Sequence, residues 1–208
     1  MEKVLINKNV AVLVENGFEE IEMTAPVKVL NQAGANVFII STGKTVKSWN
    51  IDGWGQEYAV DLDIKEANPE TFNALLLPGG VLNPDKLRMN PHAVDFVKFF
   101  VRNKLPIAAI CHGPWTLIET GMMEGRRMTG YPSIKTDILN SGAAYEDKEV
   151  VVDQGLVTSR KPADLEVFCN KMVEEFAEGP HIRDKERGPI RKQKDVPTYA
   201  GNNRLNED

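Results

Sequence analysis

Apolar residues along this chain fall into two alternating kinds of segment. In the first kind, Val, Ile and Leu form short unbroken runs, which predict β-strands buried on both faces. In the second kind, apolar residues recur every three or four positions, which predicts helices. The predicted strands cover residues 9–16, 35–41, 72–80 (a strand that runs into a turn) and 105–110, and the predicted helices cover residues 19–34, 92–103, 113–121 and 162–179.

Two other segments predict β-hairpins, and local signals mark the ends of two helices. Residues 46–60 are expected to turn around Asp52-Gly53, and residues 149–160 to form a second hairpin. Gly34 closes the first predicted helix, and Pro162 lies in the first turn of the last one.

The alternation of strands and helices predicts the fold class. Strands of continuous apolar character with helices between them indicate an α/β protein with a mostly parallel sheet covered on both faces. Residues 1–178 are expected to form one such domain. Residues 179–208 contain three prolines, dense charge of both signs and few apolar residues. This polar C-terminal tail cannot form a core of its own, so we expect it to be loose or packed on a partner subunit.

Composition narrows the class of protein further. The chain is 42% hydrophobic and 26% charged, which is typical of soluble globular proteins. Its net charge of −5 argues against nucleic-acid binding, which needs a basic face. No signal peptide is recognised and no apolar segment approaches 18 residues, so no membrane span is expected. The two cysteines, Cys111 and Cys169, do not make a disulfide framework, which favours the cytoplasm.

Cys111 lies where reactive groups are found in an open α/β sheet, just beyond the carboxyl end of a predicted strand. The sequence "AICHG" has the small-x-nucleophile-x-Gly pattern of a strand-to-helix elbow, with Ala109 and Gly113 as its small residues. A helix N-terminus lowers the pKa of a nearby thiol, so we expect a reactive thiolate. The alternative is a small buried residue that closes a strand. Cys169, on the last predicted helix, is expected in the core.

Several neighbours of Cys111 are candidates for chemistry. His112 is either a general acid or base or an exposed loop residue, and adjacent residues in an elbow usually point apart. Adjacent Cys and His lack the spacing of a metal site, so no metal is expected. Amides after a second strand end, at Gly79 and Gly80, form either an oxyanion hole or an ordinary turn. The acidic cluster Glu19, Glu20 and Glu22 is expected mostly at the surface, but one inward carboxylate would bond the thiol or move protons.

These motifs together resemble those of the PfpI-type family, including its bacterial general-stress-protein members. That family lies in the superfamily of the Parkinson-disease protein deglycase and the class I glutamine amidotransferases. The resemblance runs from about residue 9 to residue 177. The motifs that carry it occur in the family's order: "GFEEIE", "LLLPGG", "PIAAICHGPW", "TGYPSIKTD" and "EVVVDQGLVTSRKPADLEVF".

The resemblance implies a flavodoxin-like three-layer sandwich and a set of site residues. It implies that Cys111 is the nucleophile and that Glu22 hydrogen-bonds the thiol, with Glu19 nearby. It further implies that Asp85 of a neighbouring subunit orients His112, although the family has a glutamate there and this chain has one residue added before it. Such a carboxylate requires a homo-oligomer, a dimer or a hexamer. The remaining implied residues are oxyanion-hole amides at Gly80 and at Gly113 or His112, and pocket walls at Tyr131 and Trp115.

Family activities are peptidase, glyoxalase and repair of glyoxal-modified amines or thiols, and all begin with attack of a thiolate on a carbonyl group. The resemblance therefore implies a cytoplasmic stress-response cysteine hydrolase, or a deglycase or glyoxalase-like lyase, that needs no cofactor. Its expected substrates are small carbonyl compounds, peptides or glycated proteins.

Other functions compete with this interpretation. An α/β-hydrolase with His181 as its base is one, but His181 lies in the polar tail. A glutamine amidotransferase needs a His-x-Glu pair, whereas His181 is followed by Ile182 and Arg183. A flavin site is disfavoured because the acidic segment after the first strand would repel phosphate. The non-enzymatic alternative is a cysteine redox sensor or a chaperone-like stress protein, because an exposed thiolate also oxidises readily.

Overall fold

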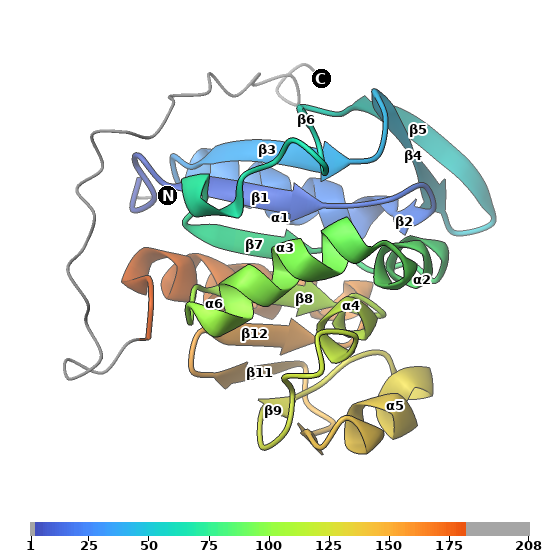
Figure 1. The fold of residues 1–208 in the computed structure, drawn as a ribbon, viewed down its shortest axis with the longest axis vertical. Helices are drawn as coiled ribbons and strands as arrows, with labels where there is room; N and C mark the ends of the chain where they lie inside the picture. The colour runs from blue at the N-terminus through green and yellow to red at the C-terminus, as the bar shows by residue number, and fades with distance from the viewer. Residues whose placement is uncertain (1–2, 182–208) are drawn as a thin grey trace.

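The structure is a computed structural model that describes residues 3–181. A seven-stranded sheet runs through its centre (Figure 1), and every neighbouring pair of strands is parallel except β11 and β12. This arrangement confirms the mostly parallel α/β sheet predicted from the sequence. In sheet order the strands are β11 (Val150–Asp153), β12 (Leu156–Ser159), β8 (Ile107–Ile110), β7 (Ala74–Leu77), β1 (Asn9–Leu13), β3 (Asn36–Ser41) and β6 (Leu62–Asp63).

Helices cover both faces of the sheet and make three layers. In the view of Figure 1, α3 lies in front of the sheet, whereas α1 and α6, which contact each other, lie behind it. The helices are α1 (Glu20–Gln32), α2 (Leu82–Met89), α3 (Pro91–Arg102), α4 (Pro114–Ile118), α5 (Lys135–Asn140) and α6 (Leu165–Glu178). Short 3-10 turns are η1 (Pro69–Thr71), η2 (Pro132–Ile134) and η3 (Pro162–Asp164).

The position of strand β1 in the middle of the sheet explains why its apolar residues do not alternate with polar ones. Successive side chains of a strand point to opposite faces of the sheet. Val10 and Val12 accordingly belong to one core cluster, together with residues of α1 and α6, whereas Ala11 and Leu13 belong to the cluster under α3. Both faces are buried from Val10 to Leu13, so each of these four positions must be apolar.

A second, three-stranded sheet projects beside the carboxyl ends of the central strands. It consists of β2 (Phe18–Glu19), β4 (Thr45–Asn50) and β5 (Gly53–Ala59), and β4 and β5 form the predicted hairpin. The residues between the strands are Ile51 and Asp52, so the turn lies one residue before the expected Asp52-Gly53. Strands β9 (Arg127–Met128) and β10 (Ala144–Tyr145) form a separate two-stranded pair.

All four predicted strands and all four predicted helices are present, with one large change of length. The predicted helix 113–121 shortens to the five residues of α4, while α2 and α5 were not predicted. Cys169 is buried in α6, as expected. In the described part of the chain, no helix is long and apolar enough to cross a membrane.

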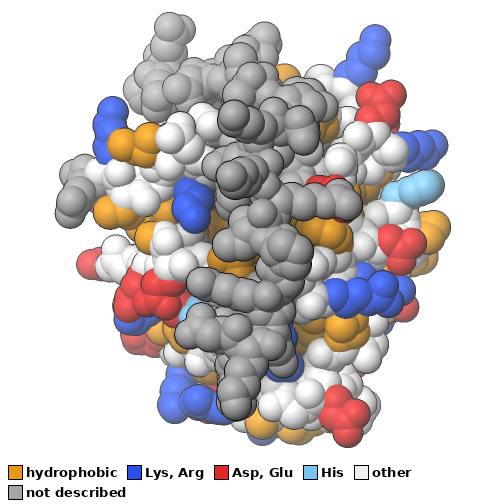
Figure 2. All heavy atoms as spheres, turned by 60° about the vertical axis from the view of Figure 1, so that its left-hand side comes forward, with side chains coloured by type: hydrophobic (Ala, Val, Ile, Leu, Met, Phe, Trp, Pro, Cys, Tyr) orange, Lys and Arg blue, Asp and Glu red, His pale blue; other side chains and the backbone are white. Residues whose placement is uncertain are grey.

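The predicted tail lies almost entirely outside the described residues. Its first residues pack on the domain: the His181 N–H donates to the Lys104 carbonyl (3.2 Å), and His181 Nε2 lies 2.8 Å from a carboxylate oxygen of Glu175. On the face shown in Figure 2, basic and acidic side chains of the described residues are interspersed, in keeping with the modest net charge.

Candidate active site

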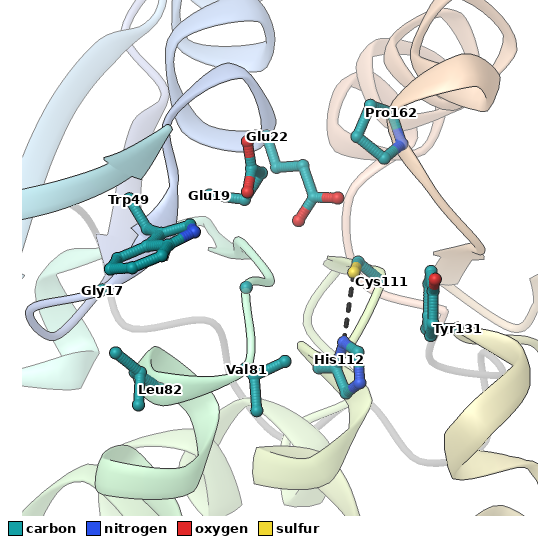
Figure 3. Close-up of a pocket in the computed structure, with 11 residues that line it drawn as sticks. Gly17, Glu19, Glu22, Trp49, Val81, Leu82, Cys111, His112, Tyr131 and Pro162 are labelled. Carbon is teal, nitrogen blue, oxygen red and sulfur yellow. Dashed lines mark hydrogen bonds between the residues drawn. The ribbon is translucent and has the colours of Figure 1, made fainter. Parts of the chain in front are cut away.

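The carboxyl ends of β7 and β8 open into a cavity of about 530 Å³. Cys111 follows β8 directly, and the Gly79-Gly80 turn follows β7. Figure 3 shows the sulfur of Cys111 between the Glu22 carboxyl group and the His112 ring. The cavity is lined by Gly17, Glu19, Glu22, Trp49, Gly80, Val81, Leu82, Cys111, His112, Tyr131 and Pro162.

The backbone around Cys111 has the predicted elbow shape. Cys111 has a φ of +61°, a left-handed conformation that is strained for a residue with a side chain. Gly113 lies so close to the preceding strands that a Cβ there would be 2.5 Å from the Leu77 carbonyl oxygen. The Cys111 N–H donates to the Ser159 carbonyl on β12 (3.0 Å), which ties the elbow to the sheet.

The ionisation of Cys111 differs from the sequence-based expectation. The residue is only 7% exposed, and burial, followed by the nearby Glu22 carboxyl group, raises the pKa of its thiol. The N–H groups of Gly80 and His112 act in the opposite direction but with less effect. The predicted lowering of the pKa is therefore wrong for this structure, because burial of the sulfur outweighs the backbone N–H groups that favour its ionised form. Cys111 is therefore a thiol at rest, and it would need a base to become a nucleophile.

Glu22 is the inward carboxylate that the acidic cluster was expected to supply. It is fully buried, and burial raises its pKa to about 8. Among the described residues, no group has normal hydrogen-bond geometry with either carboxyl oxygen, although the Cys111 thiol and the amides of Gly79 and Gly80 lie near enough to lower the pKa in part. Glu22 is consequently a neutral acid at pH 7.

The other two glutamates of the cluster have separate places. Glu20 accepts hydrogen bonds from Ser48 Oγ (2.5 Å) and the Gln56 N–H (3.1 Å), so it fixes the β4–β5 hairpin to α1. Glu19 lines the cavity, and partial burial raises its pKa.

His112 turns toward the Cys111 sulfur. Its Nδ1 lies 3.2 Å from Cys111 Sγ, and its Nε2 lies 3.0 Å from Ser133 Oγ. Burial lowers the pKa of the imidazole, which is therefore neutral at pH 7. The ring stacks on Tyr131 at 4.8 Å between ring centres. Sequence reasoning did not select Ser133, although it lies in the "TGYPS" motif, because a serine in a loop is too common to stand out.

The glycines after β7 allow Glu22 and Cys111 to approach one another. A Cβ at Gly79 would overlap Glu22 Oε2 and lie 2.5 Å from Cys111 Cβ, and Gly80 has a φ of +77°. The N–H groups of Gly80 and His112 face the sulfur and are candidates for an oxyanion hole. The Gly113 N–H already donates to the Ile110 carbonyl (2.8 Å), so it is not available for that role.

Substitution of Gly79 tests this close approach. We expect Gly79→Ala to reduce the stability by roughly 1–3 kcal/mol, because a methyl group must be inserted into a packed site. Alkylation of Cys111 by iodoacetamide should change as well, since the methyl displaces Glu22 or the sulfur. Gly53→Ala is the matched control, because a Cβ there meets no atom within 4 Å. Equal unfolding midpoints for the two variants in urea would contradict this interpretation.

Two expected site residues, and the base of the competing α/β-hydrolase interpretation, lie elsewhere. Asp85 is exposed in the first turn of α2 and does not line the cavity, so its action in a neighbouring subunit stays a prediction. Trp115 is not a cavity wall: its Nε1 donates to Asp137 Oδ2 (2.8 Å), and its ring packs edge-on behind His112. His181 lies near Gly155 at the amino-terminal end of β12, the end of the sheet opposite Cys111, so it is no base for this thiol.

One group of described side chains has a geometry suited to a metal ion. Ligand atoms of Glu175, Glu178 and His181 lie within 4.8 Å of one another at the end of α6. None of these residues lines the cavity at Cys111.

Comparison with known proteins covers the part of the chain that holds both the elbow and the Gly79-Gly80 turn. Residues 8–175 match the DJ-1/PfpI family. The chain belongs to the DJ-1/PfpI family. This confirms the resemblance found in the sequence, and the flavodoxin-like sandwich with it.

Relatives of this DJ-1/PfpI protein include one with a functional name. This chain is 46% identical to a Bacillus subtilis protein called "Putative cysteine protease YraA". The match covers 78% of this chain and 95% of that relative. Drosophila melanogaster DJ-1beta superimposes with a TM-score of 0.75 at 30% identity, over 83% of this chain and 91% of that one. A two-domain Anabaena variabilis protein with DJ-1/ThiJ/PfpI-like and ferritin-like domains gives a TM-score of 0.78 at 36% identity; the match covers 88% of this chain and about half (52%) of that protein.

Proposed function

We propose that this DJ-1/PfpI protein is a cysteine-dependent enzyme whose Cys111 sulfur adds to a carbonyl carbon. The observation that carries the proposal is the 3.2 Å contact between Cys111 Sγ and Nδ1 of a neutral, buried His112 at the wall of a cavity. A thiol with a raised pKa becomes nucleophilic only if an adjacent base takes its proton. The cysteine-protease name of the Bacillus subtilis relative supports the same class of chemistry.

The first step is common to all the expected reactions. His112 Nδ1 takes the thiol proton, the sulfur forms a bond to the carbonyl carbon, and the electron pair of the C=O bond moves to oxygen. We expect the N–H groups of Gly80 and His112, which lie beside the sulfur, to donate to that oxygen. His112 then returns the proton. Protonation of the oxygen gives a hemithioacetal; protonation of a leaving amine gives an acyl-enzyme, which water hydrolyses.

The finer assignment is a stress-response enzyme that acts on glyoxal-type carbonyls, peptides or glycated proteins. Both cysteines are free thiols, which supports a reducing compartment such as the cytoplasm. Consumption of methylglyoxal and cleavage of a fluorogenic peptide by the purified protein separate the glyoxalase and peptidase forms. Absence of both activities in protein whose Cys111 still reacts with iodoacetamide would refute the proposal.

Turnover, measured together with the oxidation state of Cys111, also tests the redox-sensor alternative. Oxidants attack the thiolate, and burial keeps Cys111 in its thiol form, so ready oxidation is not favoured. A sulfinate at Cys111 in freshly purified protein, with no turnover before oxidation, would favour the sensor instead.

The cavity lining predicts selection by charge. Two carboxyl groups, those of Glu19 and Glu22, stand beside apolar side chains such as Trp49 and Leu82, and none of the described residues that line the cavity is Lys or Arg. A negatively charged substrate or probe loses its hydration on entering the cavity, and no cationic side chain compensates for that loss, so its entry is disfavoured. We expect iodoacetate to alkylate Cys111 about tenfold more slowly than iodoacetamide. This ratio of rates is divided by the ratio of rates for the two reagents with free N-acetylcysteine, which removes their difference in intrinsic reactivity.

Removal of one carboxylate provides the control for that measurement. Glu19→Gln should narrow the difference between the two reagents, because one source of repulsion is removed while the apolar walls are retained. Equal corrected rates in the wild type would show that the cavity does not discriminate against anions.

A further inference from the structure

The second nitrogen of the His112 ring has a partner in its own chain. Nδ1 of the ring faces the Cys111 sulfur, and Nε2 lies 3.0 Å from the hydroxyl oxygen of Ser133. The sequence resemblance placed an acid from another subunit in this role. We propose that Ser133 is a positioning residue for His112, which completes a Cys111–His112–Ser133 relay within one chain.

The tautomer of His112 explains what Ser133 contributes. A neutral imidazole carries its single proton on one of its two nitrogens. Nδ1 takes the thiol proton only if the ring proton is on Nε2. The Ser133 hydroxyl oxygen accepts a hydrogen bond from that N–H and so favours the productive tautomer. After proton transfer the ring donates at both nitrogens, to the thiolate and to Ser133 Oγ, which stabilises the charged pair.

The fold holds Ser133 in register with the nucleophile. The Tyr131 N–H donates to the carbonyl oxygen of Cys111 itself (2.8 Å), and the Ile134 N–H donates to the Tyr131 carbonyl (3.0 Å). Ile134 is fully buried, and the Tyr131 ring stacks on His112. Ser133 is exposed, but these contacts on either side fix the backbone that carries it. The residue that attacks therefore also anchors the loop that orients its base.

Asp85 is the competing candidate. Within one chain it is exposed on α2, and the cavity lining does not include it. A carboxylate from another subunit would be a stronger acceptor than a hydroxyl, but it would have to reach an Nε2 that Ser133 already contacts. The two candidates differ in one measurable respect: the Ser133 relay works without any residue of a second subunit.

The pH profile of Cys111 alkylation by iodoacetamide tests the inference. We expect Ser133→Ala to lower the rate at pH 7 by about three- to tenfold, the effect of losing one ordinary hydrogen bond. The midpoint at which the profile rises, where His112 loses its proton and becomes a base, should move to lower pH, because the imidazolium is less stable without its acceptor. Ser133→Thr keeps the hydroxyl and should restore both values. Thr136→Ala removes an exposed hydroxyl from nearby α5 and should leave them unchanged.

Three results would overturn the inference. One is a Ser133→Ala variant whose pH profile has the same midpoint as that of the wild type. Another is a Ser133→Thr variant whose midpoint shifts as much as that of Ser133→Ala, which would show that the loop matters only for packing. The last is a shift in Asp85→Asn with none in Ser133→Ala, which would assign the role to a neighbouring subunit. The inference rests on the proposed role of His112 as a base, but alkylation requires no turnover, so failure of the proposed function and failure of the relay give different results.

Discussion

Replacing Cys111 with alanine is expected to abolish turnover of methylglyoxal and of peptide substrates. Loss of a covalent nucleophile leaves only binding and the oxyanion-hole donors, so we expect the rate to fall by at least about a thousandfold. The fold should remain, because the substitution removes only one sulfur atom. The small alanine side chain also suits a buried position at the end of a strand.

Cys169→Ala is the matched control for this prediction. Cys169 is the other free cysteine and is also buried, with a thiol pKa that burial raises to about 12. It lies on α6 and outside the cavity, so its loss should change turnover little. A Cys111→Ala protein that is as active as the wild type would exclude thiol chemistry altogether. Intact-protein mass spectrometry after iodoacetamide treatment identifies which of the two cysteines reacts.

Replacing Glu22 with glutamine is expected to remove a large pH dependence of stability. Glu22 has a pKa of about 8 in the folded protein and the ordinary glutamate value of 4.5 when unfolded. Between these values the folded state holds a proton that the unfolded state has lost. The wild type must therefore lose stability as pH rises through this window, because ionisation favours the unfolded chain.

The size of this effect follows from the shift. Between pH 5 and pH 8 the free energy of unfolding of the wild type should fall, relative to Glu22→Gln, by on the order of 3 kcal/mol. Glutamine has nearly the same shape and does not ionise, so the difference between the two curves isolates Glu22 from the other titrating groups. Urea unfolding at several pH values measures it. Parallel curves for the two proteins would show that the buried carboxyl group ionises as easily as an exposed one.

The main strands and helices were predictable because their signals are local. A strand buried on both faces must be apolar throughout, as Val10 to Leu13 are, and an amphipathic helix must repeat its apolar residues with the helical period. Helix α2 lacked such a signal. Its segment is short and polar, and it is held by contacts with α3 and α4 and by Asn83, whose buried amide donates to the Pro78 and Gly79 carbonyls.

The amino-acid sequence by itself determined the α/β class, the family, the elbow around Cys111 and the inward carboxyl group at Glu22. The class and the elbow follow from residue type and spacing along the chain, whereas the choice of Glu22 among the three glutamates came from the resemblance of the motifs to the family. Only the tertiary structure decided the protonation of the thiol and the partner of His112. Those depend on how much water the packed elements exclude and on which distant loop meets the elbow. Burial outweighed the backbone N–H groups that favour a thiolate at Cys111, and the fold placed Ser133, 21 residues after His112, beside the imidazole.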